Sequence, residues 1–146
     1  DVVVSYCLRI IHSDALNFFV FAMRSDSSAI ALSCIAFICP ILTNEVVICA
    51  YFDVKSRFLG DKFISKGSLS SSVVDIGSII RTALDKNASK LVLLHNHPSG
   101  DCTPSRNDIA VTDRLIEGSG IFSIELCDHI IIGDNEYYSF YENKLI

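Results

Sequence analysis

The sequence contains little of what marks disordered or fibrous chains. It has three prolines and seven glycines in 146 residues, and half of its residues are hydrophobic. This composition excludes collagen-like, low-complexity and intrinsically disordered proteins. At this length we expect one compact domain, because two independent hydrophobic cores need a longer chain.

Hydrophobic runs long enough to cross a bilayer are also missing. The longest nearly unbroken apolar stretch, residues 29–42, is interrupted by Ser33 and Pro40, whereas a transmembrane helix needs about 18 or more apolar residues. The first residues lack the basic region that begins a secretory signal. We therefore expect a soluble, cytoplasmic protein with no membrane partner.

The six cysteines form no Cys-x-x-Cys pair and no clustered metal-binding spacing. Several stand among apolar neighbours, where cysteine behaves as a small hydrophobic residue. Disulfide-rich secreted scaffolds are usually shorter chains with smaller cores. We therefore expect reduced thiols, which agrees with a cytoplasmic location.

Positive charge is scarce overall but concentrated in one segment. The formal net charge is −5, yet residues 55–90 hold seven Lys or Arg against three Asp, and residues 101–146 hold three against nine acids. The overall acidity gives little attraction to a polyanion such as DNA. The basic segment leaves open a local nucleic-acid-binding face, although it also fits an ordinary solvated surface.

Helix and strand signals alternate along the chain. The first half predicts a helix at about 28–39 ended by Pro40, a hairpin of strands at 45–53 and 57–64, and a helix that follows a capping box of Ser72 and Asp75 and stops at Asn87. The apolar face expected for this helix consists of Ile76, Ile79, Ile80, Ala83 and Leu84.

The second half predicts a strand at 90–94, a helix over 105–117 that ends at Gly118, and short strands at 121–127, 129–132 and 137–140. Together the elements indicate an α/β fold with a mixed β-sheet flanked by helices. We expect this domain to occupy residues 43–146. An N-terminal helical or undetermined segment, residues 1–42, is expected to pack on its core.

The clearest functional pattern is the string His-Asn-His-Pro-Ser-Gly-Asp-Cys-Thr-Pro-Ser-Arg-Asn-Asp at residues 95–108. His95 and His97 leave the end of a predicted strand with one residue between them, so both imidazoles project to the same side. A helix that begins near Ser105 brings Asp108 over the same point. Two histidines and one carboxylate are typical of catalytic zinc, because the fourth tetrahedral position stays open for water.

Other interpretations of these residues stay open. Ser105 and Asp108 also fit a helix capping box, and both roles are compatible, because a cap fixes the helix start that presents Asp108. Asp101 and Cys102 are rival ligands, which we interpret as turn residues that shape the loop. His95 and His97 could be ordinary loop histidines, although the full spacing favours a metal site.

Two further patterns have simpler explanations than catalysis. Asp128 and His129 fall between two predicted strands, and we interpret them as a structural pair that supports the site rather than as part of a catalytic triad. Ser99 does not form a G-x-S-x-G nucleophile elbow, because His97 stands two positions before it. The sequence also lacks the H-x-E and P-C-x-x-C strings of zinc nucleobase deaminases.

The spacing of the two histidines, Ser105 and Asp108 resembles the JAMM metalloprotease signature, and His-Asn-His-Pro-Ser-Gly-Asp has the form seen in RadC-family proteins. Further similar strings are Gly67-Ser-Leu, Asn87-Ala, Thr103-Pro-Ser and Leu126-Cys-Asp-His-Ile-Ile-Ile-Gly133. The resemblance covers about residues 43–141. It implies a JAMM/MPN domain of the cytidine-deaminase-like class with zinc on His95, His97 and Asp108. It also implies that Ser105 helps to stabilise an oxyanion and that an upstream glutamate is the general acid/base.

Glu45 is the glutamate that matches the RadC pattern. Among five glutamates it is the only one that precedes the histidines, and it opens the strand predicted at 45–53. A carboxylate beside metal-bound water could take its proton and pass it to a leaving amine. The alternative, an ordinary charge at a strand edge, also fits the sequence.

Two functions of different classes follow. The first is a zinc-dependent hydrolase that acts on a peptide or isopeptide bond in a peptide or protein substrate. The second is a DNA-repair-associated or protein-interaction module with an inactive or structural metal site, because RadC proteins carry a DNA-repair label and residues 55–90 are basic. Two departures from the family pattern are visible. The helix-hairpin-helix region of full-length RadC proteins is not recognisable in residues 1–42, which weakens the transfer of a DNA-related role. Ile76-Gly-Ser replaces a usual Pro-Arg-Glu, which removes a polar interaction at the start of a helix but none of the proposed ligands.

Overall fold

The computed structural model describes residues 44–66, 74–134 and 136–146. The predicted segment 1–42, its helix at 28–39 and the capping residue Ser72 lie outside these described residues. No helix within them is long and apolar enough to span a bilayer.

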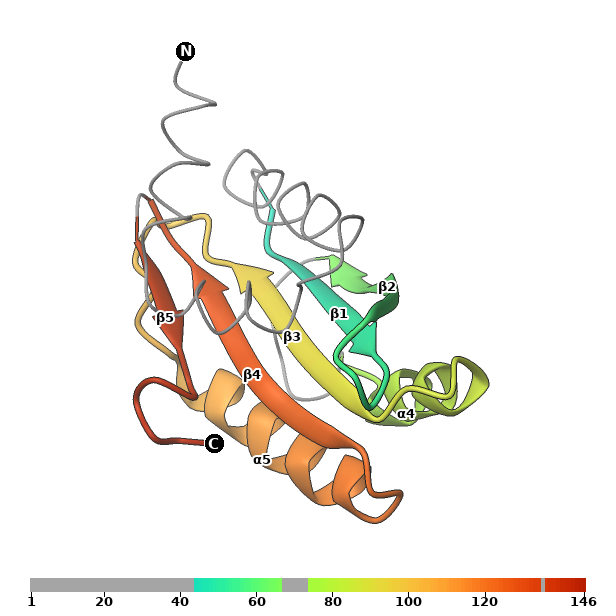
Figure 1. Ribbon diagram of the computed structural model, residues 1–146. Helices are drawn as coiled ribbons and strands as arrows, with labels where there is room; N and C mark the ends of the chain where they lie inside the picture. The colour runs from blue at the N-terminus through green and yellow to red at the C-terminus, as the bar shows by residue number, and fades with distance from the viewer. Residues whose placement is uncertain (1–43, 67–73, 135) are drawn as a thin grey trace.

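Five strands form one sheet in the order β2-β1-β3-β4-β5 (Figure 1). Their bounds are β1 Val46–Phe52, β2 Phe58–Lys66, β3 Lys90–Asn96, β4 Glu125–Ile132 and β5 Tyr137–Ser139. Strands β3 and β4 are parallel, and the other neighbouring pairs in this sheet are antiparallel. The predicted α/β class with a mixed sheet is confirmed.

Two helices, α4 (Ile76–Asp85) and α5 (Arg106–Gly120), pack on the same face of the sheet (Figure 1). The core between them and the strands includes Tyr51, Ile79, Leu91, Leu93 and Leu115. The next residues along the same strands point to the opposite face and form a second cluster there, namely Ala50, Phe52, Val92, Leu94, Ile130 and Ile132. Burial on both faces explains why the strands read as continuous apolar runs.

The predicted start of α4 is wrong in one respect. Asp75 is itself the N-cap, because its side chain accepts a hydrogen bond from the Ser78 amide at 3.0 Å. The apolar face is buried at four of its five predicted positions, whereas Leu84 is 46% exposed. Asn87 has a φ of 52°, so the left-handed stop predicted there is confirmed.

The predicted end of α5 and the strand after it are also wrong. The helix runs through Gly118 to Gly120, and the chain then turns before β4 begins at Glu125. Strand β4 continues through Asp128 and His129, so they do not lie between two strands. The register against β3 shifts at Cys127, and this irregularity explains the interrupted apolar pattern.

Candidate metal centre

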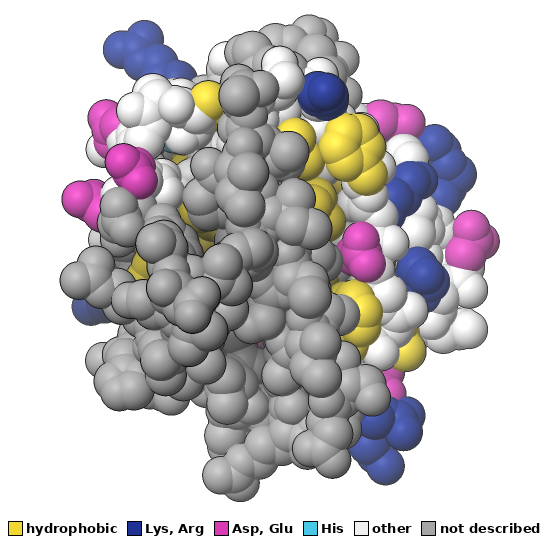
Figure 2. Space-filling model, turned by 90° about the horizontal axis from the view of Figure 1, so that it is seen from above, with side chains coloured by type: hydrophobic (Ala, Val, Ile, Leu, Met, Phe, Trp, Pro, Cys, Tyr) yellow, Lys and Arg dark blue, Asp and Glu magenta, His cyan; other side chains and the backbone are white. Residues whose placement is uncertain are grey.

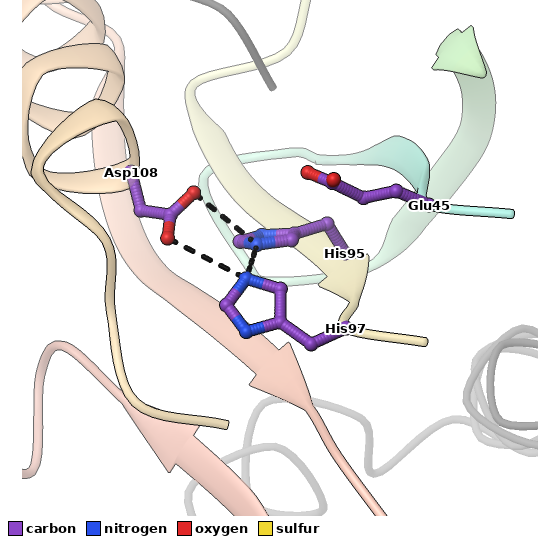
Figure 3. A group of neighbouring side chains, drawn as sticks. All are labelled: Glu45, His95, His97 and Asp108. Carbon is purple, nitrogen blue, oxygen red and sulfur yellow. Dashed lines mark hydrogen bonds and ion pairs between the residues drawn. The ribbon is translucent and has the colours of Figure 1, made fainter. Parts of the chain in front are cut away.

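Four side chains meet at the end of β3: Glu45, His95, His97 and Asp108. One ligand atom from each lies within 4.8 Å of the others (Figure 3). Because β1 and β3 are antiparallel, with Val47 opposite His95, the residue just before β1 lies beside the end of β3. The first turn of α5 supplies Asp108. The structure therefore brings together the three predicted metal ligands and the predicted general base.

The two histidines and the aspartate form a tight triangle. His95 Nε2 lies 2.9 Å from His97 Nε2 and 3.3 Å from Asp108 Oδ1, and His97 Nε2 lies 3.5 Å from Asp108 Oδ2 (Figure 3). His95 and Asp108 are fully buried, whereas the ring of His97 is partly accessible. Accessibility on one side is what an exchangeable fourth ligand needs.

Asp108 divides its two carboxylate oxygens between two roles. Oδ2 accepts a hydrogen bond from the Ser105 amide at 2.6 Å, and the Asp108 amide donates to Ser105 Oγ at 3.2 Å, which is a complete capping box. Among the described residues, Oδ1 is buried and has no hydrogen-bond partner. A buried carboxylate oxygen without a partner is costly, and a cation between Oδ1 and His95 would satisfy it.

The orientation of the His97 ring is set by a contact of its second ring nitrogen, Nδ1. Nδ1 lies 2.7 Å from the carbonyl oxygen of Asp101, which can only accept, so Nδ1 carries the hydrogen. Nε2, the atom that faces His95 and Asp108, is then the nitrogen that presents a lone pair to a metal ion once the ring is neutral. Histidines that bind metals are commonly oriented by such a bond to a backbone carbonyl.

The charges of the site suit a cation. Burial lowers the pKa of His95 to about 4, so this ring is neutral at neutral pH. Burial opposes ionisation of Asp108, but hydrogen bonds from His97 and Ser105, together with the nearby His95, outweigh it and lower the pKa of the carboxyl group. Hydrogen bonding to Asp108 raises the pKa of His97. A metal ion requires a carboxylate and neutral imidazoles, so Asp108 and His95 are already in the required states, whereas metal binding would compete with the protonation of His97 that its raised pKa favours.

Glu45 approaches from the side opposite Asp108, with its carboxylate beside His95 (Figure 3). Its backbone is fixed on both sides by Asn96, the residue between the two histidines. The Asn96 side chain accepts from the Val46 amide at 2.8 Å and donates to the Asn44 carbonyl at 3.2 Å. One buried side chain thus ties the general-base candidate to the strand that carries the histidines.

The loop between β3 and α5 is held against the end of β4. The His97 amide donates to the Ile132 carbonyl at 2.9 Å, and the Asp134 amide donates to the Gly100 carbonyl at 2.8 Å. Gly100 has a φ of +85°, and a Cβ atom on Gly133 would overlap the Gly100 carbonyl oxygen. Two glycines therefore permit the close approach that places His97.

The rival ligands lie elsewhere in the loop. Asp101 accepts a hydrogen bond from the Thr103 amide at 2.9 Å, and Cys102 Sγ lies 3.9 Å from Glu136 Oε2. Neither belongs to the cluster of possible metal ligands found among the described residues. Their placement agrees with the interpretation of both as turn residues.

Asp128 and His129 have separate tasks. Asp128 accepts hydrogen bonds from Ser139 Oγ at 2.6 Å and from the Tyr141 amide at 3.0 Å, so it anchors β5 to β4. His129 Nε2 lies 2.8 Å from His95 Nδ1, and its other nitrogen contacts Thr112. Sequence reasoning missed Thr112. The available signal was its position four residues after Asp108, one helical turn along the same face of α5.

The sequence matches the RadC-like JAB domain family over residues 24–145. The chain belongs to this family. It is 42% identical over 105 residues to a UPF0758 protein of Methanococcoides burtonii, which covers 72% of this chain and 46% of that protein. It is 45% identical over 105 residues to a UPF0758 protein of Clostridium perfringens, and this match also covers 72% of this chain and 46% of that protein.

A UPF0758 protein of Bacillus cereus is 45% identical over 101 residues, or 69% of this chain and 45% of that protein. The matched part of this RadC-like chain therefore spans less than half the length of these relatives. The family membership confirms the RadC resemblance, and the possible metal cluster lies on the residues that carry it.

Proposed function

We infer that this RadC-like domain is a zinc-dependent hydrolase that cleaves an amide bond in a peptide or isopeptide. The observation that carries this inference is the convergence, beside Glu45, of His95, His97 and the Asp108 oxygen that has no hydrogen-bond partner among the described residues. Two imidazole nitrogens and one carboxylate oxygen are ligands typical of zinc, and a fourth position left to solvent is typical of a catalytic site.

Each residue has a distinct part in the proposed reaction. Bound zinc would supply Lewis-acid polarisation of the scissile carbonyl and lower the pKa of a water to about 7. His95, His97 and Asp108 would hold the ion. Glu45 takes the proton of the attacking water and passes it to the leaving nitrogen.

Ser105 is proposed to donate its hydroxyl hydrogen to the oxyanion of the tetrahedral intermediate. Its oxygen accepts the hydrogen bond from the Asp108 amide at 3.2 Å. A hydroxyl accepts and donates at the same time, so the capping role leaves the hydrogen of Ser105 available. The cap would then hold the oxyanion donor and the metal ligand in one rigid helical turn.

The basic segment 55–90 gives little support to the nucleic-acid alternative. Five of its seven cationic side chains contact groups of the same domain, namely Arg57 with Asp53, Lys62 with Ser78 and Thr82, Arg81 with Asp75, Lys86 with the Leu59 carbonyl and Lys90 with Ser56. On the described part of the face in Figure 2, basic side chains lie among acidic and hydrophobic ones. We therefore favour the hydrolase.

The test is a screen of the zinc-loaded protein against peptides and lysine-linked isopeptides. We expect Glu45→Gln to lower the rate by about 10²–10⁴-fold and to leave the amount of bound zinc unchanged. Glu125→Gln is the matched control, because Glu125 is exposed at the opposite end of the sheet, beside Lys90. Hydrolysis that survives Glu45→Gln at full rate, or no hydrolysis of any amide, would overturn the proposal.

A further inference from the structure

We propose that Thr112 and His129 are positioning residues that fix the tautomer of His95, holding its ring hydrogen on Nδ1 and its metal-binding lone pair on Nε2. The inference rests on the metal centre of the proposed function but not on amide hydrolysis. Neither residue belongs to the cluster of possible ligands.

Three short contacts connect α5 to β4 and β3 beneath the metal centre. Thr112 Oγ1 lies 2.7 Å from the carbonyl oxygen of Asp108 and 2.7 Å from His129 Nδ1. His129 Nε2 lies 2.8 Å from His95 Nδ1. All four residues are at most 1% exposed, so no bulk water is available to exchange for any of these partners.

The direction of every hydrogen bond follows from the carbonyl group. A carbonyl oxygen only accepts, so the single hydroxyl hydrogen of Thr112 points to Asp108. Thr112 Oγ1 must then accept from His129, which places the hydrogen of His129 on Nδ1. The neutral ring of His129 therefore accepts at Nε2, and His95 donates from Nδ1.

The opposite arrangement leaves two lone pairs in contact. If His95 carried its hydrogen on Nε2, His129 would have to donate from Nε2, and its bare Nδ1 would face Thr112 Oγ1 at 2.7 Å. The hydroxyl hydrogen is already given to Asp108, so a buried acceptor would have no donor.

A doubly protonated His129 is also disfavoured. Its ring is fully buried, and its two nitrogens contact Thr112 and His95 rather than a carboxylate, so a positive charge there would be buried without a counter-charge. Its ring is held in orientation by stacking on Phe140, with 4.7 Å between the ring centroids and 15° between the planes. The ring therefore stays neutral, and its two nitrogens keep their different partners.

These three contacts also couple two of the proposed metal ligands, Asp108 and His95. Thr112 binds the carbonyl of Asp108, whose carboxylate faces His95 Nε2 at 3.3 Å. His129 sets the ring of His95 itself. Partners of this kind, behind a ligand, commonly change metal affinity by about 10–100-fold when they are removed.

The first experiment is ¹⁵N NMR of the histidine side chains in the metal-free protein at neutral pH. The chain has four histidines, so substitution of each in turn assigns the signals. We expect both His95 and His129 to carry hydrogen on Nδ1 and to have an unprotonated Nε2. A hydrogen on Nε2 of His95 would overturn the inference without any need for a variant at position 112.

The second experiment compares zinc affinity in three threonine variants. Thr112→Val keeps the shape but removes the hydroxyl, and we expect zinc affinity to fall by about 10–100-fold. Thr112→Ser restores the hydroxyl and is expected to restore affinity to within about 3-fold. Thr82→Val is the matched control, because Thr82 makes the same bond to the carbonyl four residues earlier, at 2.9 Å on α4.

If Thr112→Val bound zinc as tightly as Thr82→Val does, the inference would be contradicted. The outcome is separate from that of the hydrolase proposal. If the tautomers are as assigned but no amide is cleaved, the hydrolase is wrong and the positioning roles stand. If amides are cleaved and His95 carries hydrogen on Nε2 in the metal-free protein, the positioning roles are wrong.

Discussion

Asn96 holds Glu45 against the histidine strand by binding the chain on both sides of it. The carboxamide accepts from the Val46 amide and donates to the Asn44 carbonyl, at 2.8 and 3.2 Å. Asn96 is 2% exposed, so these bonds are protected from competition by water. The middle residue of His-Asn-His thus fixes the distance between the predicted general base and the predicted ligands.

Asn96→Ala tests this relationship. We expect the hydrolytic rate per bound zinc to fall by about 10²-fold, because a general base displaced by about 1 Å loses its alignment with the reacting water. The metal content should stay near that of the natural sequence, because His95, His97 and Asp108 are unchanged. Rate and zinc content are measured on the same preparation, and an unaltered rate per zinc would contradict the positioning of Glu45 by Asn96.

Asp108→Asn and Ser105→Ala separate the two roles of the capping box. An asparagine oxygen still accepts from the Ser105 amide, so we expect Asp108→Asn to keep most of the helix stability but to lose zinc. Ser105→Ala removes the cap and is expected to cost about 1 kcal/mol in the free energy of unfolding while zinc still binds. Denaturant unfolding and zinc titration of both variants check this. Zinc binding at full affinity by Asp108→Asn would remove Asp108 from the ligand set.

Gly133→Ala tests the close approach of the loop to β4. The added Cβ would overlap the Gly100 carbonyl oxygen, so we expect a loss of about 1–3 kcal/mol of stability from overpacking. Zinc affinity should fall as well, because the same loop carries His97. Gly120→Ala is the control, since nothing lies within 4 Å of a Cβ at that position. Equal thermal stability of the two variants would contradict the proposed role of Gly133.

We expect Asp128→Asn to change the free energy of unfolding by an amount that depends on pH, in a direction set by the pKa of Asp128. Burial raises the pKa of Asp128 in the folded protein, against the hydrogen bonds it accepts. The folded state therefore binds this proton more tightly than the unfolded chain. The stability that this bound proton gives to the folded state is fully present below the pKa of the unfolded chain, about 3.9. It is lost as the pH rises through the pKa of Asp128 in the folded state.

The natural sequence should thus exceed Asp128→Asn in stability by more at pH 4 than at pH 7. Urea unfolding of the two metal-free proteins at both pH values measures this difference. Asp113→Asn, at an exposed position of α5, controls for the change in net charge. A difference that grows towards pH 7 would show that the burial of Asp128 does not dominate its ionisation.

The sheet and the metal cluster were the predictable parts of this chain. Strands buried on both faces leave uninterrupted apolar runs, and the ligand pattern is local, because His95, His97 and Asp108 lie within fourteen residues. The fold class and the family follow from these features. The catalytic roles of Glu45 and Ser105 stay predictions, although the structure places Glu45 beside His95.

What the sequence did not predict depends on contacts between distant segments. Gly118 was expected to stop α5, but a Cβ there would lie 3.1 Å from Ile80 of α4, so the glycine permits close packing between the helices. The irregular register at Cys127 depends on β3. The contact between Thr112 and His129 joins a helix to a strand, so the position of Thr112 one turn after Asp108 does not identify His129 as its partner.

The most direct test of the metal centre is zinc stoichiometry and affinity, measured by elemental analysis and titration of the purified chain. We expect one zinc per chain in the natural sequence and a loss of binding in His95→Ala and His97→Ala. Glu45→Gln and Glu125→Gln should both retain the metal. A chain that takes up no zinc, or whose zinc persists without His95 and His97, would contradict the account at its centre.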